Sequence, residues 1–158
     1  MLVEAGGIMK FMRGIMLIEV MIVVAIIAFL AMIAVPNYLK FVARAKRAEA
    51  QLNLAALYAA EKLYWSDQSA YTNVLQGANS LGWKPEGATK YTYGFAGAEG
   101  VNYIKGTLNA DIGALSQAHA DNQGFIVVAV ADIDGDGKSD ILTINDKKEL
   151  VIVQDDLA

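Results

Sequence analysis

A run of 21 residues near the start of the chain, Ile15 to Val35, is apolar at every position except Glu19. At about 1.5 Å per residue, a helix of this length spans roughly 32 Å, which is the thickness of one bilayer core. A secretory signal peptide has a shorter apolar stretch that ends in small residues at a cleavage site. Here the run continues directly into residues rich in good helix formers. It therefore predicts a membrane-spanning helix that the protein retains.

Glu19 is the one unfavourable residue in this segment. An acid inside a membrane helix costs about 2.5 to 3.5 kcal/mol, and less near the membrane edge. Two interpretations remain open. In the first, the carboxylate reaches the headgroup layer from its place near the edge. In the second, a cut after Gly14 creates an ammonium group at Ile15, and a staggered neighbouring copy brings its ammonium against Glu19.

The sequence from Arg13 to Ala50, "RGIMLIEVMIVVAIIAFLAMIAVPNYLKFVARAKRAEA", resembles the processing site and helix of type IV pilins. The resemblance implies that a prepilin peptidase cuts after Gly14 on the cytoplasmic side and methylates the new terminus at Ile15. It also implies that Ile15 and Glu19 act in subunit assembly, and it matches Pro36 to the proline that follows the apolar run. Because the proline ring removes a backbone hydrogen bond, we expect a helix kink at Pro36. A second interpretation, that residues 26–35 stretch or melt in the filament, remains open. The match departs from the family at Ile15-Met16, where pilins usually have Phe-Thr.

Residues 1–14 are expected to be the cleaved leader. This leader is longer and more apolar than usual, so the true start is expected at Met9 or Met12. Four bases form a basic neck just after the apolar run: Lys40, Arg44, Lys46 and Arg47. Counting positive charges places the neck in the cytoplasm, whereas the cleavage site, whose peptidase is cytoplasmic, places it outside. We follow the cleavage site, and expect the neck to meet anionic headgroups or a neighbour's acids.

The rest of the chain predicts an α+β fold. Residues 36–67 read as an amphipathic helix, and one apolar stripe is expected to pack on a sheet: Leu39, Val42, Leu52, Ala56, Ala59 and Leu63. Residues 68–90 are rich in turn formers and read as a loop. Residues 91–158 hold short β-branched and aromatic runs at hairpin spacing, which predict four or five antiparallel strands. The resemblance implies the lollipop shape of a full-length pilin.

The segment "ADIDGDGKSDIL" has the alternating acids and the glycine of a calcium loop. An EF-hand is excluded, because Thr143 stands where the twelfth-position glutamate belongs and the flanking segments are strands. A strand-loop-strand Ca²⁺ site and a plain hairpin turn with solvated acids both remain. The candidate ligands are Asp132, Asp134, Asp136, the carbonyl group of Lys138, and Asp140.

Composition excludes several function classes. The chain has no cysteine, and its one histidine, His119, has no serine or aspartate at a triad-like spacing. No phosphate loop and no nucleophile constellation stand out, so we expect no enzyme and no required cofactor. The net charge is −4, with the acids concentrated at the carboxyl end, and no broad basic surface for DNA is indicated.

The resemblance implies the major subunit of a type IV pilus, a homopolymer that cytoplasmic ATPases extend and retract through an inner-membrane platform. Twitching motility, adhesion and DNA uptake are the activities it implies. The monomer would sit in inner-membrane lipid with its head in the periplasm, and the assembled pilus would be extracellular. Two alternatives remain: a pseudopilin of a type II secretion system, and an electron-conducting pilin that uses aromatic residues along the helix.

Overall fold

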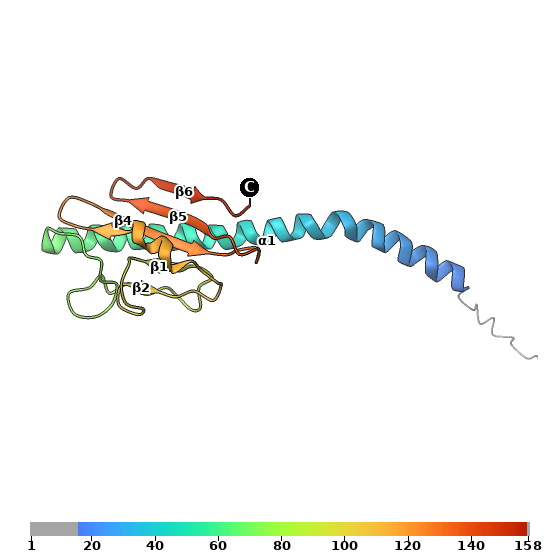
Figure 1. Ribbon diagram of the computed structural model, residues 1–158, viewed down its shortest axis with the longest axis horizontal. Coiled ribbons are helices and arrows are strands. Elements are labelled where there is room, and N and C mark those ends of the chain that lie inside the picture. The colour runs from blue at the N-terminus through green and yellow to red at the C-terminus, as the bar shows by residue number, and fades with distance from the viewer. Residues whose placement is uncertain (1–15, 158) are drawn as a thin grey trace, which may run out of the picture. The chain divides into compact units, whose positions relative to one another are not determined.

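The computed structural model describes residues 16–157 (Figure 1). The chain divides into two compact units, Met1–Tyr38 and Leu39–Ala158. Helix α1, Leu17–Gln68, begins in the first unit and ends in the second, which we call the head. The described part of the first unit is helical and exposes its apolar side chains, and by length and composition α1 can cross a membrane.

Pro36 lies inside α1. Its ring has no N–H, so the carbonyl group of Met32 lacks its usual helical donor. One residue on, Asn37 Nδ2 donates to the Ile33 carbonyl at 3.1 Å. The helix kink is expected because this hydrogen bond to the Met32 carbonyl is absent, and the kink stays a prediction.

The head contains one antiparallel sheet with the strand order β2-β1-β4-β5-β6, and β3 pairs with β4 beside this path. A 3₁₀ helix, η1 (Ile112–Gln117), precedes β3. The strands are β1 (Thr92–Gly94), β2 (Tyr103–Ile104), β3 (His119–Ala120), β4 (Phe125–Ala131), β5 (Asp140–Asn145) and β6 (Leu150–Gln154). The predicted α+β class, a long helix on an antiparallel sheet, is confirmed. The sheet has six strands rather than four or five, because the two-residue strand β3 is too short to leave a pattern in the sequence.

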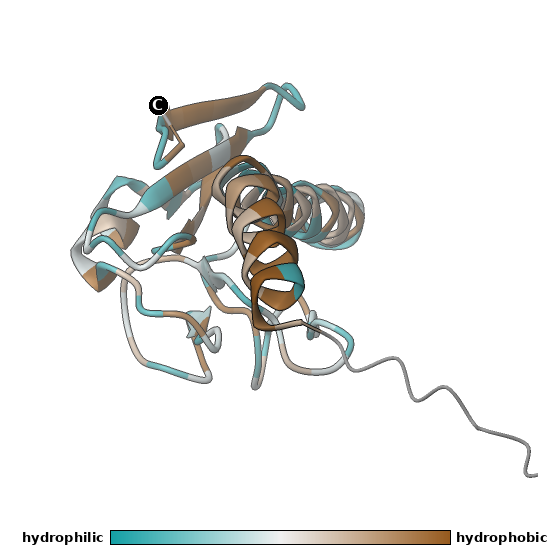
Figure 2. Cartoon of the chain, turned by 90° about the vertical axis from the view of Figure 1, so that its right-hand side faces the viewer, coloured by the Kyte–Doolittle hydropathy of each residue, from teal (hydrophilic) through white to brown (hydrophobic). Residues whose placement is uncertain are grey.

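The core lies between α1 and the sheet, and six of the seven residues of β4 are buried. Along α1 the buried side chains are Ala43, Ala50, Leu54, Leu57 and Glu61. The stripe expected to pack on the sheet was wrong: Leu39, Leu52 and Leu63 are exposed. The first half of α1 is brown, and therefore apolar, in Figure 2. The head part of α1 carries apolar residues on two faces, so periodicity alone could not select the packed face. Small side chains at positions 43 and 50 let the helix approach the sheet closely.

Strand β6 forms one edge of the sheet, next to β5. All five of its residues are exposed. The chain then turns back, so that the Asp156 side chain is buried again near the start of the β4–β5 loop.

Candidate functional site

Glu19 lies in the first turn of α1, where its amide donates to the Met16 carbonyl at 3.0 Å. Its neighbours in the sequence are apolar and exposed, and Ile18 and Val20 leave 64% and 48% of their surface open. Gly14 and Ile15 lie outside the described residues, as does the whole expected leader with Met9 and Met12. Cleavage, methylation and the pairing of Ile15 with Glu19 therefore stay predictions.

The head part of α1 carries a second apolar row on the face that points away from the sheet. Its large members are strongly exposed: Phe41 by 70%, Leu52 by 74% and Leu63 by 66%. The row recurs at spacings of three and four residues, as in helices that pack against other helices. We call this row the outer seam; its members are Phe41, Ala45, Ala48, Leu52, Ala55, Ala59 and Leu63.

Two members of the basic neck contact the head itself. Lys46 Nζ donates to the Ile133 carbonyl at 2.6 Å. Arg47 Nε donates to Asp140 Oδ2 at 3.0 Å, and Nη2 of the same residue pairs with Asp140 and Asp155. Burial opposes the charge of Arg47, but the bonds to the two carboxylates raise its pKa above the ordinary value. These two bases therefore join α1 to the sheet and its carboxyl end.

The other two members, Lys40 and Arg44, are exposed. Neither forms an ion pair within residues 16–157. The neck thus splits into a pair that holds the head together and a pair that is available to a partner.

Four carboxylates converge at the β4–β5 loop. One oxygen from each of Asp132, Asp134, Asp136 and Asp156 lies within 4.8 Å of the others. The loop turns at Gly135 and Gly137, whose φ angles of 89° and 91° favour glycine. Both amides point back at Asp132, which accepts from Gly135 at 2.6 Å and from Gly137 at 3.1 Å. The sequence therefore folds this segment into a tight acid-lined turn.

Asp156 is the member of the cluster that sequence reasoning missed. It is 7% exposed, and Oδ2 accepts from the Ile133 amide at 3.0 Å. Its other oxygen, Oδ1, is buried without a hydrogen-bond partner among the described residues. Burial raises the pKa of this carboxyl, the Ile133 amide lowers it, and the charges of the three loop acids raise it further. A buried carboxylate with one oxygen that lacks a donor, in a cluster with three other acids, suits a hard cation.

The structure does not bring Asp140 into this cluster. Its side chain is fully buried and accepts from Arg47, from the Tyr91 hydroxyl at 2.7 Å and from the Asp156 amide at 3.2 Å. Lys138 does lie in the loop, with its ammonium 3.8 Å from Asp136 Oδ2. No signal in the sequence points to Asp156, because two whole strands, β5 and β6, separate it from the loop.

Glu61 is a second buried acid that sequence reasoning missed. It is fully buried on α1, where Oε2 accepts from the Thr72 amide at 3.3 Å and Oε1 has no partner among the described residues. Burial raises the pKa of Glu61 to about 7, against the opposing effect of the Thr72 amide. Its position, eleven residues after Ala50 and seven after Leu54, places it on the buried face. This helical spacing is the signal in the sequence that could have shown Glu61 to be buried.

Comparison with known proteins places this helix and head in context. No family model matches the chain. Over 122 residues, it is 40% identical to the type IV major pilin protein PilA of Myxococcus xanthus (strain DK1622), an alignment that covers 77% of this chain and 54% of the relative. Over most of its length the chain is similar to a type IV major pilin. The resemblance read from residues 13–50 is thereby confirmed.

A second relative of this pilin-like chain comes from a secretion system. The chain is 34% identical over 73 residues to type II secretion system core protein G of Pectobacterium carotovorum subsp. carotovorum. That alignment covers 46% of this chain and 47% of the relative. The chain thus spans about half the length of both relatives.

Proposed function

We propose that this chain is the major structural subunit of a type IV pilus, which polymerises through α1 into an extendable and retractable surface filament. The observation that carries the proposal is α1 itself. Its first half is apolar and exposed, and its second half keeps an apolar outer seam after the opposite face has packed on the sheet. Exposed apolar surface of this extent calls for a partner, and lipid followed by other copies of the chain supplies it.

In this role the chain works by assembly rather than by catalysis, and it needs no cofactor. A prepilin peptidase would cut after Gly14 and methylate Ile15, and an inner-membrane platform with its ATPases would drive extension and retraction. The monomer would sit in the inner membrane and the polymer outside the cell. Twitching motility, adhesion and DNA uptake are the activities that such a filament serves. The runner-up is a secretion pseudopilin, which the similarity to core protein G favours.

The test is the isolation of filaments from cells that make the chain at its native level. We expect shearing to release long filaments, visible by electron microscopy, whose subunit begins with N-methylated Ile15 in mass spectrometry. Filaments that never leave the cell surface would favour the pseudopilin. A subunit that keeps residues 1–14 would contradict the proposed processing.

We also propose that the head binds Ca²⁺ through Asp132, Asp134, Asp136 and Asp156, with the carbonyl group of Lys138 as a further ligand. Four acids within 4.8 Å repel one another, and calcium accepts six to eight oxygen ligands of this type. Because Asp156 follows β6, the ion would tie the segment after β6 to the β4–β5 loop.

Calorimetry on the purified full-length protein in detergent tests the calcium proposal. We expect binding with a dissociation constant between about 1 μM and 1 mM, and a stabilisation of about 2.7 kcal/mol when calcium is a hundredfold above it. Asp156→Asn should remove both effects. Asp67→Asn, at an exposed acid near the end of α1, should change neither. The absence of heat at millimolar calcium would end the proposal.

A further inference from the structure

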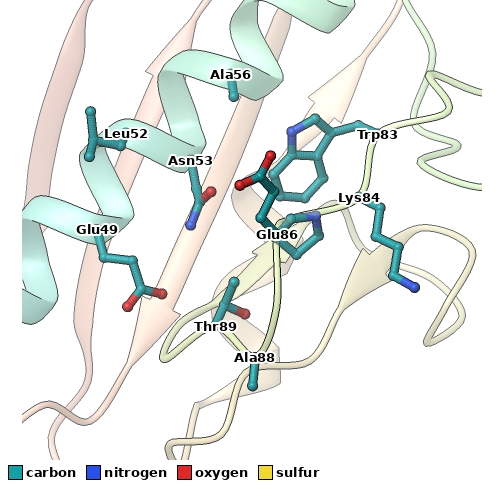
Figure 3. A pocket seen from close by; sticks show the side chains of 10 residues that line it. Glu49, Leu52, Asn53, Ala56, Trp83, Lys84, Glu86, Ala88 and Thr89 are labelled. Carbon is teal, nitrogen blue, oxygen red and sulfur yellow. The ribbon is translucent and has the colours of Figure 1, made fainter.

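A groove of about 560 Å³ runs between α1 and the loop of residues 83–89 (Figure 3). Glu49 and Asn53 line it from the helix, and Trp83 and Glu86 line it from the loop. The carboxylate of Glu86 points toward the helix, whereas Lys84 extends away from it (Figure 3). Glu49 also fastens the loop, since its Oε1 accepts from the Lys90 amide at 2.8 Å. The groove is therefore an acidic slot with an aromatic wall, built into the head.

The complementary charge stands on the same helix, on the other side of the outer seam. Arg44 is exposed and has no ion-pair partner in the part of the chain that the structure describes. At 3.6 residues per turn, Arg44 lies about 60° to one side of the outer seam and Glu49 about 80° to the other. A basic flank and an acidic flank lie on opposite sides of the apolar seam, and Arg44 and Glu49 do not pair with each other within residues 16–157. They suit a head-to-tail contact, in which the basic flank of one copy meets the acidic flank of the next.

The spacing of these charges along the helix matches the spacing expected at the membrane end. Glu19 follows Ile15 by four residues, and Glu49 follows Arg44 by five. These offsets correspond to about 6 and 7.5 Å along a helix, in the same direction. In each unit, a neighbouring copy would therefore be shifted in the same direction along the chain, so that its Ile15 comes level with Glu19 and its Arg44 comes level with Glu49.

We propose that Arg44 of one copy enters the groove of the next copy in the filament and pairs there with Glu49 and Glu86. The inference rests on the proposed function, because it takes the second copy as the occupant. A contact of this kind uses two different surfaces, so it does not close into a dimer but repeats into an open helical polymer. The Arg44 contact would set the stagger of the heads while Glu19 sets that of the membrane segments.

Charge reversal in cells that carry the full-length chain tests this contact. We expect Arg44→Glu and Glu86→Arg each to lower the yield of sheared filaments by about tenfold, because like charges would then face each other. The double variant should return to within about twofold of the wild type. Lys84→Glu is the matched control, since its side chain extends away from the groove, and it should leave the yield unchanged. Equal membrane accumulation and equal melting temperatures would establish that every variant folds.

Cross-linking gives a second measurement. The chain has no cysteine, so a disulfide between copies can join only introduced residues. Arg44→Cys combined with Glu86→Cys should yield a ladder of covalent multimers on oxidation of the filaments. Arg44→Cys combined with Lys84→Cys should yield a much weaker one.

Two results would overturn the inference. One is an unchanged filament yield for Arg44→Glu. The other is a loss that the double variant does not restore, together with no ladder, as expected if Arg44 contacts anionic lipid instead. Glu19→Ala, tested in parallel, distinguishes failure of the Arg44 contact from failure of the proposed function. If Glu19→Ala removes filaments and Arg44→Glu does not, the proposed function stands and the inference falls. If the wild type makes no filaments, both fall.

Discussion

Replacing Glu19 by alanine will abolish surface filaments while the protein still enters the membrane. In a monomer the change is favourable, because it removes an acid from an apolar segment. In the polymer it leaves the ammonium group of a neighbour's Ile15 buried without a counter-charge. Breaking one side of a buried ion pair costs about 3 to 5 kcal/mol. Repeated at every subunit contact, such a loss is incompatible with a long filament.

The measurement is the yield of sheared filaments against the amount of subunit in the membrane. Glu19→Gln keeps the size and polarity of the side chain and removes only its charge, so it should fail as Glu19→Ala does. Glu99→Ala, at an exposed acid of the head, should assemble normally. Normal filaments from Glu19→Ala would refute the pairing of Glu19 with the Ile15 ammonium group of a neighbour. If only Glu19→Gln made normal filaments, the contact would be a hydrogen bond rather than an ion pair.

The second large effect is expected at Asp140, where alanine should lower the free energy of unfolding of the head by about 3 to 5 kcal/mol. Asp140 is fully buried and accepts from Arg47, from the Tyr91 hydroxyl and from the Asp156 amide. Removing it leaves these donors without their acceptor, and the Arg47 side chain, only 13% exposed, keeps Asp155 as its one carboxylate. Asp140→Ala therefore removes an ion pair and two further hydrogen bonds from the same buried site.

Thermal unfolding of the full-length protein in detergent measures this effect. Asp155→Asn is the matched control, because Asp155 is the other carboxylate that pairs with Arg47 and its side chain is 42% exposed. It should lower the melting temperature much less than Asp140→Ala does. Calcium binding by Asp140→Asn, measured in the same preparation, discriminates between the two roles considered for Asp140. Calcium affinity within about threefold of the wild type, with a lower melting temperature, is the result expected from a structural residue. Loss of calcium binding at an unchanged melting temperature would return Asp140 to the ligand set.

The fold class could be read from the sequence because its signals are local. A long apolar run, a stretch of helix-forming residues and short β-rich runs each lie within a single segment. The acidic loop could be recognised for the same reason, since its alternating acids and Gly137 lie within nine residues. The role of Glu19 could be stated as a hypothesis because the proposed cut lies five residues before it.

What escaped prediction depends on contacts between distant segments. Both faces of the head part of α1 are apolar, so either could have packed on the sheet, and only the folded head selects the face with Ala43, Ala50 and Leu54. The places of Asp140, which was expected in the acidic cluster, and of Asp156, for which nothing was expected, escaped prediction for the same reason. Asp140 meets Arg47 from α1, which lies 93 residues earlier, and the returning carboxyl end brings Asp156 to the loop.

The sequence by itself therefore determined that this protein has a membrane-length helix with one acid, an antiparallel head and an acid-rich turn. Hydrophobic length, periodicity and turn chemistry act between near neighbours, so they can be read without a fold. Only the tertiary structure decided which face of α1 stays open to another copy and which carboxylate completes the acidic cluster. Burial and charge pairing act through space, and the chain brings those residues together only when it folds.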